Sequence, residues 1–288
     1  MTFGIYGNTA KPVIKKITKQ LISFLSRKNI SFILHSELGK LLGKNKKYAT
    51  ANEKDLPGQC DMLIALGGDG TILSAARLVG KHKTPILGVN LGKLGFLAEI
   101  SVDELEECIS DILKKKFIVE ERLALQAISK KDKKKYFGLN EIVIDNGASP
   151  RVVELETYVN DDYLVTYSAD GIVLATPTGS TAYSLAMGGP LVAPQSNVII
   201  INPMAPHTLT ARPVIVPDDS VIKVRVKFAS KQIHISSDGQ MEGFYDVPAE
   251  FEIKKTDYKI KLVKRKQRTF YDLLRTKLMW GRDVRVKG

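Results

Sequence analysis

The chain has 288 residues, of which 44% are hydrophobic and 26% charged, and its formal net charge is +12. This size and composition are typical of a folded protein of two domains, and no apolar run approaches the ~20 residues that a membrane-spanning helix needs. Residues 1–6 lack the basic and apolar regions of a secretory signal peptide, and Cys60 and Cys108 have no motif spacing. We therefore expect a cytoplasmic protein with reduced thiols.

The first third of the chain alternates apolar runs with helical patterns. The run at 62–66 is continuously apolar, as expected for a parallel strand that is buried on both faces. In the helical patterns, apolar residues recur every three or four positions. This alternation predicts an α/β domain of the doubly wound kind over residues 1–120. The predicted strands are 3–6, 30–34, 62–66 and 86–91, and the predicted helices are 13–25 and 102–113.

From about residue 120 the pattern changes to strict alternation of apolar and polar residues. In the segment 221–228, Ile222, Val224 and Val226 alternate with lysine and arginine, and Phe228 is predicted to continue the buried face. A period of two marks strands with one buried and one solvated face. Several such segments at short spacing predict an all-β, sandwich-like domain over residues 121–265. The other alternating segments are 232–236, 250–253 and 258–262.

The C-terminal segment is strongly basic and partly helical in pattern. Residues 254–288 carry 13 Lys and Arg against three Asp. This charge is compatible with nucleic-acid binding through counterion release, with attraction of small polyanions such as nucleotides, or with a solvated surface. Over the tail 266–288 we expect a helix that packs back on the N-terminal domain and closes at Trp280 and Gly281. The lysine-rich segment 130–135 is predicted to be a solvated hairpin tip.

A glycine-rich string, Gly67-Gly68-Asp69-Gly70-Thr71, follows the apolar run 62–66 and precedes a helical pattern. Glycines let the backbone approach a ligand closely, and the N-terminus of the next helix offers unpaired N–H groups to an anion. Asp69 then stands among donors suited to phosphates or sugar hydroxyls. A tight turn with Asp69 as helix cap is the structural alternative. The sequence has no Walker loop, no G-x-G-x-x-G fingerprint and no protein-kinase motif set, so a nucleotide must be held in another way.

Three further strings carry polar chemistry. Asn140-Glu141 sets a carboxamide beside a carboxylate, which can read an adenine edge or a ribose diol. Asp170-Gly171 is followed by the hydroxyl-rich run 175–184, where O–H and N–H groups can hold a phosphate or an amide and Tyr183 can stack on a ring. Asp238-Gly239-Gln240 ends a predicted strand. Taken alone, the first of these strings is compatible with polar surface, and the last with a hairpin turn.

Together and in order, these strings resemble the NAD kinase family. The resemblance rests on 67–71, 140–141, 176–183 and 238–240, with further support from 206–213. The glycine-rich string is shared with lipid kinases and phosphofructokinase-like enzymes, whereas the Asn-Glu pair and the hydroxyl-rich run are together specific. The resemblance implies an N-terminal α/β domain, a C-terminal all-β domain and an active site between them. It also implies NAD and ATP as substrates, a divalent ion (Mg²⁺ or Mn²⁺), and a homodimer or homotetramer in which NAD is reached partly from a neighbouring subunit.

The resemblance also implies roles for individual residues. Asp69 is implied as the catalytic residue, the phosphate loop is implied at Gly67, Gly68, Gly70 and Thr71, and no dedicated protein ligands are expected for the metal. Two positions depart from the family pattern: Ala186 replaces a frequent serine, and Ser168 replaces a longer polar residue. These departures concern contacts to the substrate rather than the reaction. NAD contacts are implied for Asp69, Gly70, Asn140, Glu141, Arg151, Ser168, Asp170, Thr181, Ala182, Tyr183, Ser184, Ala186 and Gln240.

The expected reaction transfers the terminal phosphoryl group of ATP, or of another triphosphate or polyphosphate, to the 2′-hydroxyl of NAD's adenosine ribose, giving NADP. Asn140 and Glu141 are expected to hold the ribose, and Asp69 to accept or orient the hydroxyl proton. Because a free Asp has a pKa of about 3.9, orientation or metal contact is the alternative role for Asp69.

Two other classes of function stay open at this point. A lipid or diacylglycerol-type kinase would share the glycine-rich string and could meet anionic lipid through the basic tail. A nucleic-acid-binding module would use the basic C-terminus together with its aromatic residues. We expect neither a membrane nor a nucleic acid as partner. The hydroxyl-rich run is not expected in a lipid kinase, and Phe270, Leu273, Leu274 and Leu278 of the basic tail have the spacing of a helix face that packs on the body of the protein.

Overall fold

The structure is a computed structural model that describes residues 1–43, 48–92, 95–147, 149, 151–229, 232–265 and 269–279. The chain forms two compact units: unit 1 comprises residues 1–72, 84–120 and 262–288, and unit 2 comprises residues 73–83 and 121–261. The domain ranges 1–120, 121–265 and 266–288 stay predictions. Trp280 and Gly281 lie outside the described residues.

Unit 1 is built on an eight-stranded sheet with the order β3-β2-β1-β4-β5-β20-β7, in which β6 also pairs with β5. The pairs of β1 with β2 and β4, and of β5 with β4 and β20, are parallel. Strand β4 is buried at every position, as its apolar run predicts. The strands are β1 (Thr2–Gly7), β2 (Ser31–His35), β3 (Thr50–Ala51), β4 (Met62–Gly67), β5 (Ile86–Asn90), β6 (Ile100–Ser101), β7 (Ile118–Arg122) and β20 (Ile260–Lys264).

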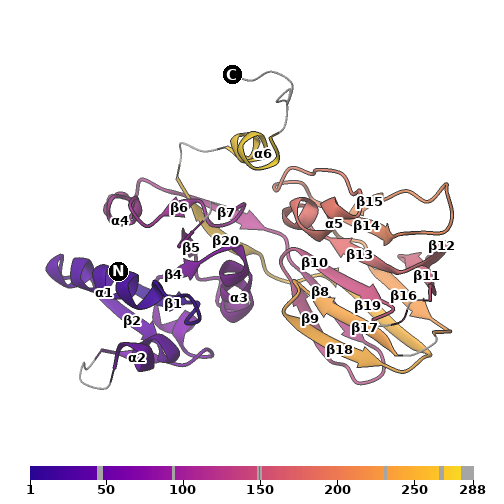
Figure 1. Cartoon of the computed structure of the whole chain (residues 1–288), viewed down its shortest axis with the longest axis horizontal. Helices are drawn as coiled ribbons and strands as arrows, with labels where there is room; N and C mark the ends of the chain where they lie inside the picture. Colours follow the sequence, from indigo (N-terminus) through magenta and orange to yellow (C-terminus); the bar gives the residue numbers. More distant parts are fainter. Residues whose placement is uncertain are drawn as a thin grey trace. The chain divides into compact units, whose positions relative to one another are not determined.

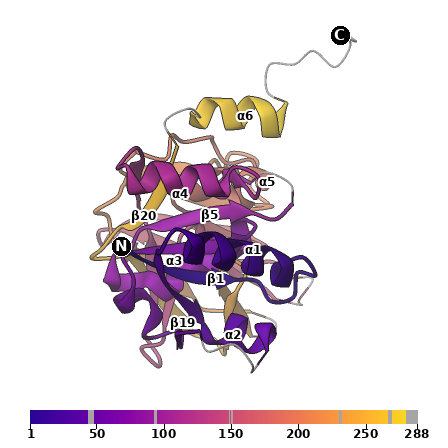
Figure 2. The ribbon, with the colours of Figure 1, turned by 90° about the vertical axis from the view of Figure 1, so that its left-hand side faces the viewer.

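Two predicted helices, α1 (Ile14–Arg27) and α4 (Leu105–Leu113), lie on the same side of this sheet (Figure 2). Their apolar residues share one core cluster with the strands, which explains the spacing of three and four in the sequence. This arrangement confirms the predicted α/β fold. The remaining helical elements outside the sandwich are α2 (Ser36–Leu42), η1 (Leu56–Gln59), α3 (Asp69–Val79), η2 (Gly80–His82) and α6 (Phe270–Leu278). No helix in the described part of the chain is both long and apolar enough to span a membrane.

Unit 2 is a sandwich of two six-stranded antiparallel sheets, whose strands are labelled in Figure 1. The inner faces share one core, in which Ile142 and Ile172 of the first sheet cluster with Leu155, Val224 and Phe251 of the second. The all-β prediction is thereby confirmed. The first sheet contains, in order, β15 (Val214–Pro217), β14 (Val198–Met204), β13 (Gly171–Ala175), β10 (Glu141–Asp145), β17 (Ile233–Ser237) and β18 (Met241–Tyr245); the second contains β12 (Asp162–Ala169), β11 (Val153–Val159), β16 (Ile222–Val226), β19 (Ala249–Lys255), β8 (Leu125–Ser129) and β9 (Lys135–Gly138).

Two strand predictions differ from the structure in detail. Strand β16 ends at Val226, so Phe228 leaves the buried face and is 74% exposed. The last alternating segment forms β20, which pairs with β5 of unit 1 through Leu262 and Ile86 instead of joining the sandwich. A period of two shows that a strand has a solvated face, but it does not show which sheet the strand joins. The lysine-rich segment 130–134 is an exposed hairpin tip between β8 and β9, as predicted.

Much of the C-terminal positive charge is paired within the protein. Ion pairs with aspartate or glutamate are formed by Lys254, Lys255, Lys259, Lys264, Arg265 and Arg275. Part of this charge therefore has a structural role. The predicted tail helix is present as α6, and it begins with a capping box in which Thr269 and Asp272 bond each other's backbone N–H groups.

Candidate active site

The glycine-rich string forms the turn between β4 and α3 in unit 1. Gly67 ends the strand, α3 begins at Asp69, and the Thr71 N–H donates to the Gly68 carbonyl at 2.9 Å. A side chain at Gly67 would overlap the buried Thr71 side chain, so the turn has room only for glycine there. Gly70 is exposed. The predicted phosphate loop is therefore the turn of a strand–turn–helix unit, and the first backbone N–H groups of α3 follow directly after it.

The Asp69 carboxylate is held by the loop 95–98 of the same unit. Its Oδ2 accepts a hydrogen bond from Phe96 N–H at 2.7 Å, and its Oδ1 accepts from Leu97 and Ala98 N–H, both at 3.0 Å. An added Cβ at Gly95 would overlap this carboxylate. Because an ionised carboxylate has about four acceptor positions, three bonds leave one for a ligand. Asp69 therefore organises the loop 95–98, a role that the sequence did not reveal.

A buried ion pair lies directly after the loop 95–98. Glu99 follows the loop directly, and Lys264 of β20 donates a short hydrogen bond to its Oε1. Both side chains are more than nine-tenths buried, and their opposite charges compensate each other inside the protein. The next residue, Arg265, lies within 3.6 Å of three acidic side chains of the α4 region, those of Glu104, Glu107 and Asp111. Strand β20 thus anchors the segment that holds Asp69.

In unit 2, the Asn140-Glu141 pair lies at the start of β10 and is fixed there by Asp238. The Asp238 carboxylate accepts hydrogen bonds from the N–H groups of Leu139 (2.9 Å), Asn140 (2.8 Å) and Glu141 (3.2 Å). In return the Asp238 N–H donates to the Glu141 carbonyl at 3.1 Å. Asp238 and Gly239 both have positive φ, of 51° and 61°, which suits the hairpin turn between β17 and β18. Asp238 is therefore the anchor of the Asn-Glu pair.

The Glu141 carboxyl group has an unusual environment. Its side chain is buried, and the backbone N–H of Tyr183 donates to it. Within the described residues its Oε2 has no hydrogen-bond partner. The pKa of Glu141 is raised to about 8. The main cause is burial of the carboxyl group, and the nearby Asp238 carboxylate adds to it. This group can exchange a proton near neutral pH.

The hydroxyl-rich run is hydrogen-bonded to the backbone at and next to the Asn-Glu pair. Thr176 Oγ1 donates to the Leu139 carbonyl at 2.6 Å, and the Thr176 N–H donates to the Asn140 carbonyl at 2.8 Å. Gly179 packs against Asn140 so closely that a Cβ would overlap its backbone. Ser180 Oγ donates to Pro177 O at 2.8 Å. The hydroxyls of Thr176 and Ser180 therefore hold the run in place.

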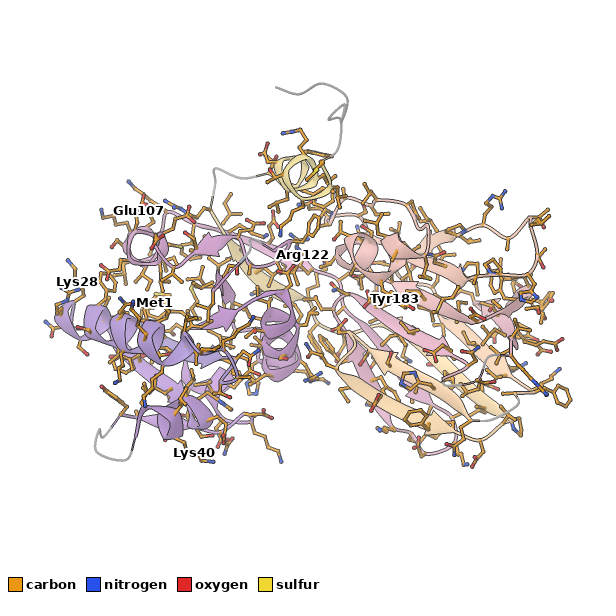
Figure 3. The ribbon with its side chains drawn as sticks, viewed as in Figure 1. Met1, Lys28, Lys40, Glu107, Arg122 and Tyr183 are labelled. Atoms are coloured by element: carbon orange, nitrogen blue, oxygen red, sulfur yellow. The ribbon has the colours of Figure 1, made fainter. Side chains whose placement is uncertain are left out.

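Beyond these hydroxyls the chain forms η3 (Thr178–Thr181) and the short helix α5 (Tyr183–Ala186). Ser184 is fully buried, and Asn202 Nδ2 donates to its carbonyl at 3.0 Å. Tyr183, which is labelled in Figure 3, is 40% exposed, and Ala186 is exposed as well. Tyr183 is therefore free to stack on a ring, whereas the Ser184 side chain faces the protein interior.

The remaining residues predicted to contact NAD fall into a second group. Strand β10 runs from Glu141, which pairs with Ala175 of β13, to Asp145, which pairs with Gly171 of β13. At the usual rise per residue its two ends are ~13 Å apart. At the far end Asn146 bonds both the Asp170 carbonyl, through its N–H, and the Arg151 carbonyl, through its side chain. Ser168 lies on β12, which ends at Ala169, directly before Asp170. Gln240, which is exposed, accepts a 2.8 Å hydrogen bond from Ser74. The structure thus brings Asn140, Glu141 and 181–184 together, but not Arg151, Ser168 and Asp170 with them.

Among the described residues, acidic and metal-ligating side chains do not gather into a cage. Across the part of the chain that the structure describes, no group of three or more His, Cys, Asp or Glu side chains has the arrangement of a metal site.

Two sequence models of one protein family match this chain. The model of the ATP-NAD kinase N-terminal domain matches residues 3–117, and that of the C-terminal domain matches residues 139–265. Among curated relatives, the NAD kinase of Bacteroides fragilis is 40% identical over 292 residues, covering 99% of this chain and all of the relative. The NAD kinase of Caldanaerobacter subterraneus subsp. tengcongensis is 42% identical over 278 residues, covering 96% and 98%.

Two solved structures have the same fold. Yeast NADH kinase, determined in complex with NADH, superposes with a TM-score of 0.91 at 27% identity, covering 100% of this chain and 90% of that one. An NAD kinase from Archaeoglobus fulgidus, in complex with ATP, gives a TM-score of 0.75 at 25% identity, covering 95% and 97%.

The α/β unit with its glycine-rich turn, the antiparallel sandwich and these matches define a kinase, that is, a phosphotransferase. Both halves match the same family, and this disfavours the lipid-kinase alternative. The chain belongs to the ATP-NAD kinase family.

Proposed function

We propose that the protein transfers the terminal phosphoryl group of ATP to the 2′-hydroxyl of the adenosine ribose of NAD, giving NADP. The match of both family models to residues 3–117 and 139–265 carries this proposal. The two structural relatives hold NADH and ATP, which are the two kinds of substrate that such a reaction joins. The rigidly fixed Asn140-Glu141 pair and the glycine-rich turn supply polar groups that can bind these two kinds of substrate.

On the acceptor side, Asn140 and Glu141 hold the ribose, and Tyr183 stacks on a ring of NAD. Asp69 has one acceptor position left after its three backbone hydrogen bonds, and this position orients the hydroxyl. Buried Ser184 acts by shaping the run 181–184, since Asn202 binds its carbonyl. The other residues assigned to NAD binding in this proposal are Gly70, Thr181, Ala182, Ala186 and Gln240.

Arg151, Ser168 and Asp170 are also assigned to NAD. The backbones of Arg151 and Asp170 contact Asn146, just beyond the end of β10 that lies ~13 Å from Glu141. This separation supports a homodimer or homotetramer, in which these residues reach a dinucleotide bound to a neighbouring subunit. We also assign the protein to the cytoplasm. This assignment is supported by two free cysteines, Cys60 and Cys108, whose pKa burial raises to about 11, so that neither thiol is reactive.

On the donor side, the turn formed by Gly67, Gly68, Gly70 and Thr71 binds the triphosphate. A divalent ion, Mg²⁺ or Mn²⁺, neutralises phosphate charge when it is bound. The donor set fits an ion that arrives with the nucleotide, because the described residues contain no group of three ligands for it. Catalysis by these residues then consists of positioning the two substrates and stabilising charge.

The test is NADP formation from NAD and ATP with Mg²⁺, measured with an NADP-specific dehydrogenase. The wild-type protein should form NADP, and Asp69→Asn should lose ~100-fold or more in kcat. Asp103→Asn, at an exposed position of unit 1, is the matched control and should retain full activity. Absence of product with ATP, polyphosphate and either metal would refute the function, and near-normal turnover by Asp69→Asn would refute the role of Asp69.

A further inference from the structure

We propose that a cavity in unit 2 binds a small organic carboxylate with an apolar body. The cavity has a volume of about 370 Å³, which lies within the ~300–1,000 Å³ range of small-molecule sites. Its lining comes from the hairpin tip after β8, from the end of β16 and from the segment between β18 and β19 (Figure 1). None of its lining residues is assigned to NAD or ATP, so this site goes beyond the proposed reaction.

Two cations in the cavity lining share one carboxylate. Arg225 of β16 lies directly opposite Glu250 of β19, and its Nε donates to Glu250 Oε2 at 2.9 Å. From the hairpin tip, Lys130 Nζ lies 3.2 and 3.3 Å from the two oxygens of the same carboxylate. These three side chains therefore carry one positive charge in excess.

The other charged pairs at the cavity do not remove this excess. Among the described residues, Lys227 pairs with Glu156 of β11, and Lys131 pairs with Asp246 at 3.7 Å. Each of these pairs joins one cation to one anion and is neutral by itself. A ligand with a single negative charge would therefore neutralise the group around Glu250.

Glu250 keeps its negative charge at neutral pH. Partial burial raises the pKa of this carboxyl group, but the hydrogen bonds from Lys130 and Arg225 outweigh burial and lower the pKa overall. The carboxylate is thus already engaged by both cations. A ligand must supply its own anionic group, and this group would meet the two cations from the side of the cavity.

The Arg225 guanidinium group is held in one orientation. Its central carbon lies over the Tyr158 ring, 4.8 Å from the ring centroid, while its Nε–H is bonded to Glu250. The side chain is 40% exposed, and most of the five N–H donors of a guanidinium group remain for a ligand. A carboxylate matches this planar fork and brings one charge, whereas a phosphate monoester brings about −1.5 to −2.

The rest of the lining is largely apolar. Val226 and Ala249 pair across β16 and β19, and both are buried. Tyr245 is 6% exposed, and its hydroxyl donates to the Asp132 carboxylate at 3.1 Å, so it contributes apolar surface rather than a free donor. Together with Pro248, these residues can pack against the body of a ligand while the charged side orients its carboxylate.

The test compares two probes that differ in charge at one end only. These are para-(trifluoromethyl-diazirinyl)benzoate and the neutral carboxamide of the same acid. Their binding to the full-length protein is followed by ¹⁹F NMR. The benzoate should bind with a Kd of ~1 mM or tighter. The carboxamide should bind ~10-fold more weakly, because it lacks the charge-assisted hydrogen bonds. Equal affinities would overturn the proposal.

Irradiation of the bound benzoate locates the site. The diazirine loses N₂, and the resulting carbene inserts into a neighbouring bond of the protein. Mass spectrometry of peptides should then find the label in the segments 129–131, 225–227 and 245–250, which line the cavity. A label found only in other segments would overturn the proposal.

Variants on β16 separate the guanidinium group from charge in general. Arg225→Gln should weaken binding of the benzoate ~10-fold or more but leave carboxamide binding unchanged, which also shows that the cavity is intact. Arg225→Lys keeps the charge without the fork and should give an intermediate affinity. Lys223→Gln is the matched control, because Lys223 lies on the same face of β16, pairs with Asp161 and does not line the cavity. An equal loss in Lys223→Gln and Arg225→Gln would show unspecific attraction and overturn the proposal.

A competition experiment distinguishes a carboxylate site from a phosphate site. Inorganic phosphate should displace the benzoate no better than chloride at the same ionic strength. Stronger displacement by phosphate would overturn the assignment to a carboxylate. None of these measurements depends on NADP formation, so their outcome is independent of whether the proposed function holds.

Discussion

The buried carboxyl group of Glu141 should make the free energy of unfolding depend on pH in a defined direction. Its pKa is about 8 in the folded protein, against a usual value of 4.5. Between these two values the folded protein holds the proton, whereas the unfolded chain releases it. Because the unfolded state binds fewer protons there, this group stabilises the fold fully below pH 4.5, and its contribution is lost as the pH rises toward 8.

Glu141→Gln removes this titration with little change in shape, since glutamine keeps an acceptor for the Tyr183 N–H. One unit of pKa corresponds to about 1.4 kcal/mol, so the 2.5 units between pH 5.5 and a pKa of about 8 correspond to about 3 kcal/mol. The variant should therefore gain about 3 kcal/mol of stability relative to the wild type when the pH rises from 5.5 to 8.5. Any pH-independent effect of the substitution cancels in this comparison.

The assay is urea unfolding followed by circular dichroism, for both proteins, at pH 5.5, 7.0 and 8.5. Glu154→Gln serves as the control and should show a constant offset, because its side chain is exposed on β11. A difference between Glu141→Gln and wild type that stays constant within about 0.5 kcal/mol over this range would refute the reasoning. The low-dielectric environment assigned to Glu141 would then be incorrect.

Two further predictions concern the segment that holds Asp69. Gly95→Ala should reduce kcat at least tenfold with little loss of thermal stability, because the added methyl group displaces the carboxylate, whereas Gly92→Ala, where a Cβ meets nothing within 4 Å, should retain full NADP formation. Lys264→Met should lower the free energy of unfolding in urea by about 3–5 kcal/mol, because it removes the cation that lies against the buried Glu99 carboxylate. Adding Glu99→Gln to Lys264→Met should restore much of this stability, and a double variant as unstable as the single one would contradict the account.

The sequence predicts the elements that carry strong local patterns. The continuous apolar run of β4, the spacing of α1 and α4 and the alternation of β16, β17 and β19 depend on the periodicity of each element, and the structure contains all of them. Helix α2, of seven residues, has too few turns to establish a helical period. The motif strings are also local, so the Asn-Glu pair and the hydroxyl-rich run could be recognised before their contacts were known.

Contacts between distant residues could not be predicted in this way. Phe96, the first residue of the loop to bond Asp69, lies 27 residues after it, and Lys264 follows Glu99 by 165 residues. Asp238 is nearly a hundred residues away from the Asn-Glu pair that it anchors. No periodicity relates positions so far apart, and one sequence gives no covariation. Asp238 was recognised as part of a motif, but its hydrogen bonds to Leu139, Asn140 and Glu141 became visible only in the fold.

The position of β20 determines the order in which unit 1 can be completed on the ribosome. This strand lies between β5 and β7 in the sheet, yet it is synthesised after all of the sandwich. At ~5–20 residues per second, the nascent chain carries β5 and β7 for roughly ten seconds or longer before β20 emerges. During this interval an unpaired strand edge, which can pair with other chains, must be protected. The polypeptide therefore acquires a complete first sheet only after the whole sandwich has been made, and release of the chain before β20 leaves that edge open.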